Sequence, residues 1–178
     1  MGKVLIISSN ALGDTYLSAS SLETLKSFDP SMEIHFIAQK DSNFLLQNLP
    51  VDKIFSLNDK TVSDIFYLIK RIRRNKYDIV FDFFPGIVNT IFFYFSKSRI
   101  KAGYPNFIKR NQWFNVSQRA IIKGTSSQRF VWQPHMNYLL RISKLLELTG
   151  IANKHVAKPI FINLAPFANH FKKDSVTI

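Results

Sequence analysis

The sequence contains no cysteine among its 178 residues, and this absence excludes disulfide bonds and thiolate metal sites. A chain without cysteine suits a reducing compartment. No run of eighteen apolar residues occurs, so we expect no membrane-spanning helix. The apolar run within the first ten residues is too short for a signal peptide, and we therefore expect a cytoplasmic protein. The four histidines lie far apart, and no group of His, Asp and Glu has the spacing of a metal site. We expect no metal and no other cofactor.

Acidic residues are scarce, with 12 Asp and Glu against 24 Lys and Arg, and the net charge is +12. The excess belongs to the middle of the chain, because residues 61–130 carry 13 basic and three acidic side chains. A positive region of this kind attracts nucleic acid, anionic lipid or a phosphorylated glycan. A solvated basic surface without a ligand is the alternative interpretation.

Apolar runs that alternate with helical periodicity predict the fold class. Runs typical of strands buried on both faces occur at residues 3–8, 32–38, 52–57 and 77–84, with a fifth strand expected at 99–104. Helices are expected from Asp14 to near Pro30, around 44–49, from Thr61 or Ser63 to Arg74, and over 86–96. This alternation indicates an α/β fold with a Rossmann-like, open, mostly parallel sheet flanked by helices.

The second half of the chain is less regular. Residues 105–132 are basic and aromatic, and we expect a long loop with short elements there. A helix is predicted over 135–150 with Gly150 as its stop, and a further strand over 158–168. We therefore expect one Rossmann-like domain over residues 1–150, followed over 151–178 by a linker and the start of a second domain.

The stretch "SSNALGDT" (residues 8–15) lies where the first strand gives way to a helix, at the sheet edge where α/β proteins bind ligands. Gly13 is its only glycine and no Gly-Lys-Ser/Thr follows, so it is neither a dinucleotide fingerprint nor a phosphate-binding P-loop. Asp14 has two interpretations. It is a helix cap or first-turn acid, or it is a carboxylate that takes a proton from a substrate hydroxyl.

Six segments, taken together, resemble the N-terminal half of glycosyltransferase family 9, whose best-known members are the ADP-heptose:lipopolysaccharide heptosyltransferases. In chain order they are "S-x-A-L-G-D", "P-x-x-E-I-H-F-I-A", "YDIVFDF", "RIKAGY", "HMNYLLRISKLLELTGI" and "INLAPFANHFKK". The resemblance spans nearly all of this chain but about half of a typical family member. It implies the acceptor-side domain of an inverting GT-B type enzyme, with the C-terminal domain largely absent.

The resemblance also implies roles for individual residues. Asp14 matches the aspartate that deprotonates the acceptor hydroxyl, with Asn10 and Gly13 beside it as acceptor-binding residues. The lysine that contacts the donor phosphates falls at Lys173 by its spacing from Pro166, and Lys172 is the alternative. Phe167 and Asn169 stand where the family has glycine and serine.

Basic side chains in the middle of the chain are further acceptor-binding candidates, because guanidinium groups bind phosphates and carboxylates through paired hydrogen bonds. The cations at the end of the third helix also have a structural explanation, since positive charge stabilises a helix C-terminus. His135 is a candidate because it begins the family's His-led helix, whereas His35 is expected to be packed in its strand. The acceptor-binding candidates in this region are Arg71, Arg73, Arg74, Lys109, Arg110, Arg119 and His135.

The resemblance predicts transfer of a sugar from a nucleotide-sugar donor, such as ADP-heptose, to a lipopolysaccharide-type or other cell-envelope glycan. The partners expected are that donor and an anionic glycolipid acceptor, with peripheral contact at the inner face of the membrane. Without a complete second domain, this chain is expected to be inactive alone.

The competing interpretation is a basic α/β module that binds nucleic acid or anionic lipid without catalysis. The middle region contains Trp113, Phe114, Phe107 and Tyr104, which are able to stack on bases. No recognised nucleic-acid motif is present, so this interpretation is disfavoured. A flavodoxin-like regulator is disfavoured as well, because the phosphate-binding loop is missing.

Overall fold

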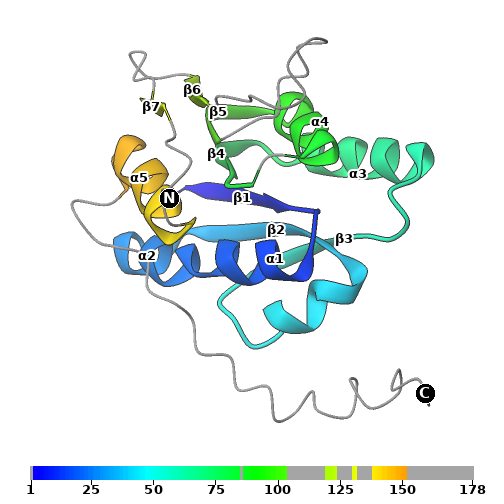
Figure 1. The fold of residues 1–178 in the computed structure, drawn as a ribbon, viewed down its shortest axis with the longest axis horizontal. Coiled ribbons are helices and arrows are strands. Elements are labelled where there is room, and N and C mark those ends of the chain that lie inside the picture. The colour runs from blue at the N-terminus through cyan, green and yellow to red at the C-terminus, as the bar shows by residue number, and fades with distance from the viewer. Residues whose placement is uncertain (1, 85, 104–118, 124–129, 132–137, 152–178) are drawn as a thin grey trace.

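The computed structural model describes residues 2–84, 86–103, 119–123, 130–131 and 138–151 (Figure 1). Its sheet has seven strands in the order β3-β2-β1-β4-β5-β6-β7. The first five pair in parallel, and β6 and β7 extend the sheet by antiparallel pairing. The strands are β1 (Lys3–Ser8), β2 (Glu33–Gln39), β3 (Lys53–Leu57), β4 (Tyr77–Asp82), β5 (Ser98–Gly103), β6 (Arg119–Lys123) and β7 (Phe130–Val131).

Helices cover both faces of this sheet (Figure 1). They are α1 (Leu12–Ala19), α2 (Ser21–Phe28), the 3-10 helix η1 (Lys40–Leu46), α3 (Val62–Arg74), α4 (Ile87–Phe95) and α5 (Tyr138–Leu148). Side chains of β1 alternate between two cores. Val4 and Ile6 pack in the core that α2 and α5 share, whereas Leu5 and Ile7 pack in the core beneath α3 and α4. The central strand is therefore apolar throughout, as a strand buried on both faces must be.

The Rossmann-like prediction is confirmed for the part of the chain that the structure describes. Helix boundaries also follow local signals. Thr61 caps α3 by accepting a hydrogen bond from the Asp64 backbone N–H at 3.2 Å. Gly150, with φ +78°, lies just beyond α5, where the backbone N–H of Ile151 bonds to the Leu146 carbonyl at 3.1 Å.

Two details differ from the sequence-based expectation. The single helix predicted from Asp14 is two helices that meet at Ser20, where the Ser20 and Ser21 hydroxyls donate to carbonyls three residues earlier at 2.6 and 2.7 Å. The helix expected around 44–49 is η1, which lies earlier and is narrower. The short strands β6 and β7 lie in the region expected as a long loop with short elements, most of which is outside the described residues. The strand predicted over 158–168 and the second domain lie outside the described residues.

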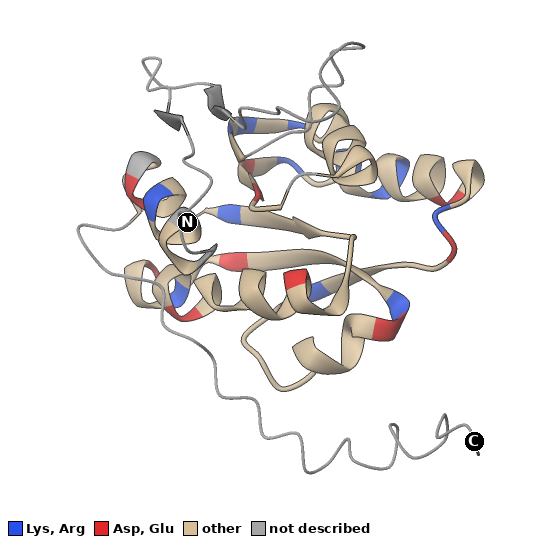
Figure 2. Cartoon of the chain, viewed as in Figure 1, with Lys and Arg blue, Asp and Glu red and all other residues tan. Residues whose placement is uncertain are grey.

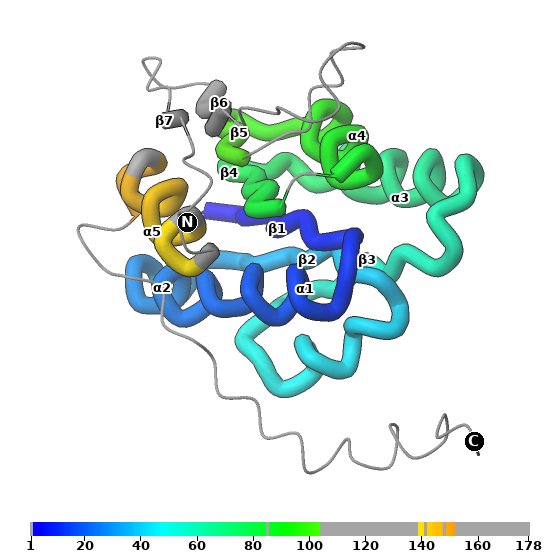
Figure 3. The backbone as a smooth tube through the Cα atoms, viewed as in Figure 1, coloured from blue at the N-terminus to red at the C-terminus, as the bar shows by residue number. Residues whose placement is uncertain are grey.

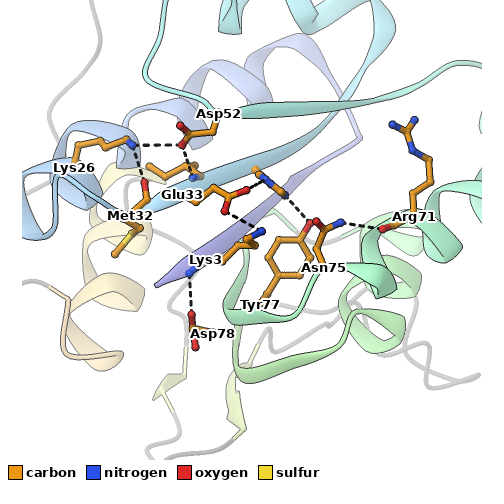
Figure 4. Close-up of polar contacts among 11 residues, drawn as sticks. Lys3, Lys26, Met32, Glu33, Asp52, Arg71, Asn75, Tyr77 and Asp78 are labelled. Atoms are coloured by element: carbon orange, nitrogen blue, oxygen red, sulfur yellow. Dashed lines mark hydrogen bonds and ion pairs between the residues drawn. The ribbon is translucent and has the colours of Figure 1, made fainter. Parts of the chain in front are cut away.

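Polar side chains join the amino ends of the central strands (Figure 4). Lys3 forms an ion pair with Glu33 at 2.8 Å, and Asp78 accepts a hydrogen bond from the Lys3 backbone N–H at 2.8 Å. His35, buried in β2, contacts the Tyr77 hydroxyl at 2.9 Å and the Glu33 carboxylate at 2.6 Å. His35 is therefore a packed strand residue, as expected from the sequence.

Burial lowers the pKa of His35 below its ordinary value, although the hydrogen bond that its imidazole N–H donates to the Glu33 carboxylate opposes this shift. The hydrogen bond with Lys3 lowers the pKa of Glu33, and burial raises that of Tyr77. At neutral pH these shifts favour a neutral imidazole between a carboxylate and a neutral phenol.

The pKa shift of His35 predicts how stability depends on pH. Because the unfolded chain binds a proton at this histidine more readily than the folded chain, stability should decrease as the pH falls below about 6.5. Urea unfolding between about pH 7.5 and pH 5.5 measures the slope, and His35→Gln should flatten it. An unchanged slope in the variant would contradict the assignment. The carboxylates with lowered pKa values affect stability only at lower pH.

Candidate functional site

The candidate site lies at the edge of the sheet where the parallel strands end. Since β1, β2, β3 and β4 are parallel, the residues that follow Ser8, Gln39, Leu57 and Asp82 all emerge at this edge. Ligands bind at the corresponding edge in open α/β sheets. The loop that carries Asp14 is the one between β1 and α1.

The side chain of Asn89 in α4 fixes the start of that loop. Its oxygen accepts a hydrogen bond from the Ser9 backbone N–H at 3.0 Å and a second from the Ser9 hydroxyl. Its nitrogen donates to the Phe84 carbonyl at 2.9 Å and to the Asp82 carboxylate at 3.2 Å. Ser9, Asp82 and Asn89 are all fully buried. One amide therefore joins the ends of β1 and β4 to α4.

Asn10, the next residue, is held from two sides. A β-carbon at Gly86 would overlap the Asn10 side-chain amide, so that amide packs directly against the backbone at the start of α4. With the Gln39 amide oriented to satisfy its neighbours, its nitrogen donates to the Asn10 carbonyl at 3.0 Å, and its oxygen accepts from Lys60 Nζ at 2.8 Å. Lys60 Nζ also donates to the Asn10 carbonyl, at 3.3 Å.

The backbone of Lys60 itself has φ 54°, in the left-handed region that residues other than glycine rarely adopt. The ends of β1, β2 and the β3–α3 connection thus meet at one carbonyl. No motif around Gln39 or Lys60 indicates these roles. Asn89 was detectable in principle, because it is the only amide in the uncharged helix "IVNTIFFYF" and buried amides require hydrogen-bond partners.

Asp14 is the third residue of α1, in its first turn, and Ala11 occupies the cap position. Of the two structural interpretations, the first-turn acid is therefore correct and the cap is not. The following residue, Thr15, is buried and donates to the carbonyls of Ala11 and Ser8 at 3.3 and 3.4 Å, which ties this turn to the end of β1. Asp14 itself is partly exposed beside this anchored backbone.

Gly13 is exposed, and apart from its chain neighbours and the backbone of α1 no atom lies within 4 Å of the position that a β-carbon would take there. Its φ angle does not require glycine. Nothing inside the described structure therefore explains a glycine at this position. A molecule that approaches the first turn of α1 from outside would benefit from the missing side chain.

The arginines of α3 lie far from Asp14. Helix α3 begins after the carboxyl end of β3 and ends just before the amino end of β4, so Arg71, Arg73 and Arg74 lie toward the opposite edge of the sheet. The Arg71 guanidinium lies over the rings of Phe55 and Tyr67, 5.4 and 5.5 Å from their centroids. Figure 4 shows the Asn75 amide directed at the Arg71 carbonyl.

Of the predicted site residues, the structure therefore brings together Asn10, Gly13 and Asp14, and it separates the α3 arginines from them. Lys109, Arg110, His135, Lys172 and Lys173 lie outside the described residues. Within the described ranges, no cluster of His, Asp and Glu could hold a metal ion. Within the same ranges, every helix is too short or too polar to cross a bilayer.

Comparison with known proteins identifies similar chains. Lipopolysaccharide heptosyltransferase 1 of Campylobacter coli is 31% identical over 127 aligned residues, which cover 64% of this chain and 36% of that protein. No family model matches. A glycosyltransferase family 9 structure from Veillonella parvula has a TM-score of 0.62 at 17% identity. The alignment covers 97% of this chain and 49% of the Veillonella chain.

The Escherichia coli heptosyltransferase WaaC, solved with ADP, has a TM-score of 0.57 at 13% identity. ADP-heptose heptosyltransferase II of the same organism has a TM-score of 0.54 at 14% identity. This chain spans about half the length of these solved structures, 53% and 51%, and about a third of the curated relative, 36%. The resemblance to glycosyltransferase family 9 is thus confirmed, and the chain has the fold of a GT-B type N-terminal domain.

Two glycines of the site should respond differently to substitution. Gly13→Ala should leave the free energy of unfolding unchanged or raise it by up to about 1 kcal/mol, because alanine favours a helix and meets no neighbour. Gly86→Ala should lower it by about 1–3 kcal/mol, because the new methyl group displaces Asn10. Urea unfolding of both variants measures the contrast. Equal stability of Gly86→Ala and wild type would show that Asn10 is not held there.

Removing the Asn89 side-chain amide should lower the free energy of unfolding more than removing the Asn75 amide. Asn89→Ala should lower the free energy of unfolding by about 2–3 kcal/mol, because it leaves the Phe84 carbonyl and the Ser9 N–H buried without this partner. Asn75→Ala is the control. It removes one partly buried hydrogen bond and should cost about 0.5–1.5 kcal/mol. Similar losses in both variants would contradict a central role for Asn89.

Proposed function

We propose that this chain is the acceptor-side domain of a heptosyltransferase-like glycosyltransferase. The substrates proposed are a nucleotide-sugar donor, such as ADP-heptose, and a lipopolysaccharide-type or other cell-envelope glycan. The observation that carries the proposal is the position of Asp14, partly exposed in the first turn of α1 beside the anchored Ser9–Asn10 backbone. The sequence similarity to heptosyltransferase 1 supports the same assignment.

Asp14 acts in this proposal as a general base for inverting transfer. Its carboxylate takes the proton of an acceptor hydroxyl while that oxygen forms a bond to the anomeric carbon of the donor sugar. The bond from the anomeric carbon to the donor phosphate breaks, and the nucleoside diphosphate leaves with that electron pair. A positioned base contributes about 10²–10⁴-fold to the rate.

In this proposal the acceptor approaches α1 over Gly13, where no neighbouring side chain occupies the space beside the backbone. The Asn10 backbone, held by Gln39 and Lys60, fixes the position of the first turn relative to that ring. Lys109, Arg110 and His135 are further proposed acceptor contacts. Arg71, Arg73 and Arg74 are too far from Asp14 to contact the reacting hydroxyl. They could contact only a distant part of a larger acceptor.

The donor is proposed to bind mainly to a second domain, with Lys172 or Lys173 near its phosphates. Escherichia coli WaaC has been solved with ADP and with ADP-2-deoxy-2-fluoro heptose, which fits a donor of this class. No metal ion is required in the proposal. Since this chain supplies one side of the cleft, we expect no turnover from it alone, and robust turnover of ADP-heptose on a glycan acceptor would overturn this part.

The role of Asp14 is tested in a longer protein, in which this chain is joined to the remaining part of the Campylobacter coli relative. Asp14→Asn should lower the turnover number by about 10²–10⁴-fold, because the amide cannot accept the proton. Asp41→Asn is the matched control, since Asp41 is an exposed carboxylate in the first turn of η1, which contacts α1. Full activity of Asp14→Asn would reject the assignment.

A further inference from the structure

Asp82 places a carboxylate in the interior of the sheet, where an apolar residue would serve the fold. It is the last residue of β4, which lies beside β1 (Figure 3), and its side chain is fully buried. The residue opposite it in β1 is the apolar Ile7. Taking a carboxylate out of water costs free energy that an apolar side chain would not cost. A role other than stability therefore accounts for Asp82 best.

The Asp82 carboxylate fixes which way the Asn89 amide points. It accepts a hydrogen bond from Asn89 Nδ2 at 3.2 Å, and the Phe84 carbonyl accepts another from the same nitrogen at 2.9 Å. A carbonyl and a carboxylate offer only acceptors, so together they hold the amide nitrogen on the β4 side. The amide oxygen then faces Ser9, where it accepts from the backbone N–H at 3.0 Å and from the hydroxyl. The charge in this contact comes from β4, because α4 carries no charged residue (Figure 2).

The loop between Ser9 and the first turn of α1 is tied at both ends. Asn89 holds its start through the Ser9 backbone N–H. Thr15 holds its end, because its buried hydroxyl donates to the Ser8 carbonyl at 3.4 Å and its backbone N–H donates to the Ala11 carbonyl at 3.1 Å. A shift of Ser9 would therefore move the first turn of α1 and the carboxylate that this turn carries.

We propose that Asp82 and Asn89 are positioning residues for sugar transfer. Both are fully buried, so they act without touching a substrate, by holding Ser9 where the Asp14 carboxylate meets the acceptor hydroxyl. A reacting group misplaced by about 1 Å loses on the order of 10²-fold in rate, so a rigid support has catalytic value. This inference rests on the proposed role of Asp14. The alternative is that the charge of Asp82 acts directly on Asp14, and the experiment separates the two.

Amide hydrogen exchange of the purified chain tests the support without any substrate. Asn89→Leu keeps nearly the same size and removes the hydrogen-bonding groups. The Thr15 amide should then exchange at least about tenfold faster than in wild type, although its own bond partner is unchanged. The Ile65 amide is the matched control, because it forms the corresponding first-turn bond of α3, to the Thr61 carbonyl at 3.0 Å. No change at Thr15, or an equal change at Ile65, would overturn the proposal.

Kinetics in the longer protein, joined to the remaining part of the Campylobacter coli relative, tests the effect on transfer. Asn89→Leu and Asp82→Leu should each lower kcat by about 10–100-fold and leave KM for the donor within about twofold, because the donor is proposed to bind mainly elsewhere. The double variant should lose no more than Asn89→Leu alone, because Asp82 acts through that amide. Asp82→Asn keeps an acceptor oxygen in the same volume and should stay within about threefold of wild type.

Tyr77→Phe is the matched control, because Tyr77 is a buried polar residue at the other end of β4. It loses the contact with His35 at 2.9 Å, and its kcat should stay within about twofold of wild type. Circular dichroism checks that each variant folds. Ser9→Ala is the milder variant if a leucine variant does not fold. It removes the hydroxyl bond to Asn89, keeps the backbone bond and should lower kcat about two- to tenfold.

Three kinetic results would also overturn the proposal. They are full kcat in Asn89→Leu, losses that add in the double variant, and equal losses in Asp82→Asn and Asp82→Leu, which would assign the effect to charge. Full activity of Asp14→Asn would instead reject the proposed base. In that case the exchange of the Thr15 amide would still show whether Asn89 supports the turn.

Discussion

The candidate site depends on one buried amide. Asn89 comes from an otherwise apolar helix, yet its side chain accepts two hydrogen bonds from Ser9 and donates to the Phe84 carbonyl and the Asp82 carboxylate. These groups have no access to water, so each needs a partner within the protein. A single side chain that satisfies all of them fixes where the chain leaves β1. The position of Asp14, five residues later, follows from that fixed start.

The parallel sheet places two groups of polar residues at opposite edges. Loops after the strands gather Asn10, Gly13 and Asp14 at one edge, while α3 carries its arginines toward the other. The polar contacts at the amino edge, among Lys3, Glu33 and His35, involve buried or paired groups that hold strands together. The open space over Gly13 lies at the carboxyl edge. The first turn of α1 is therefore the place in the described structure where we propose that a substrate hydroxyl meets a carboxylate.

The likeness to family 9 supports one functional proposal at two levels. Similarity to heptosyltransferase 1 concerns sequence, and the solved structures at 12–17% identity concern the fold.

The sequence by itself determined the strands of the parallel sheet, a helix start at Thr61 or Ser63, the stop at Gly150 and the place of Asp14 at a helix start, because apolar periodicity and end signals act between near neighbours. It also identified Asn10, Gly13 and Asp14 as one stretch. Only the tertiary structure decided that Gln39, Lys60 and Asn89 support this stretch, since their partners lie 29, 50 and 80 positions away from Asn10 or Ser9. Only the structure showed that the first helix ends at Ser20, because the sequence does not reveal which hydroxyl bonds to the backbone. Only the structure showed that the α3 arginines lie away from Asp14, because this depends on the direction in which α3 crosses the sheet.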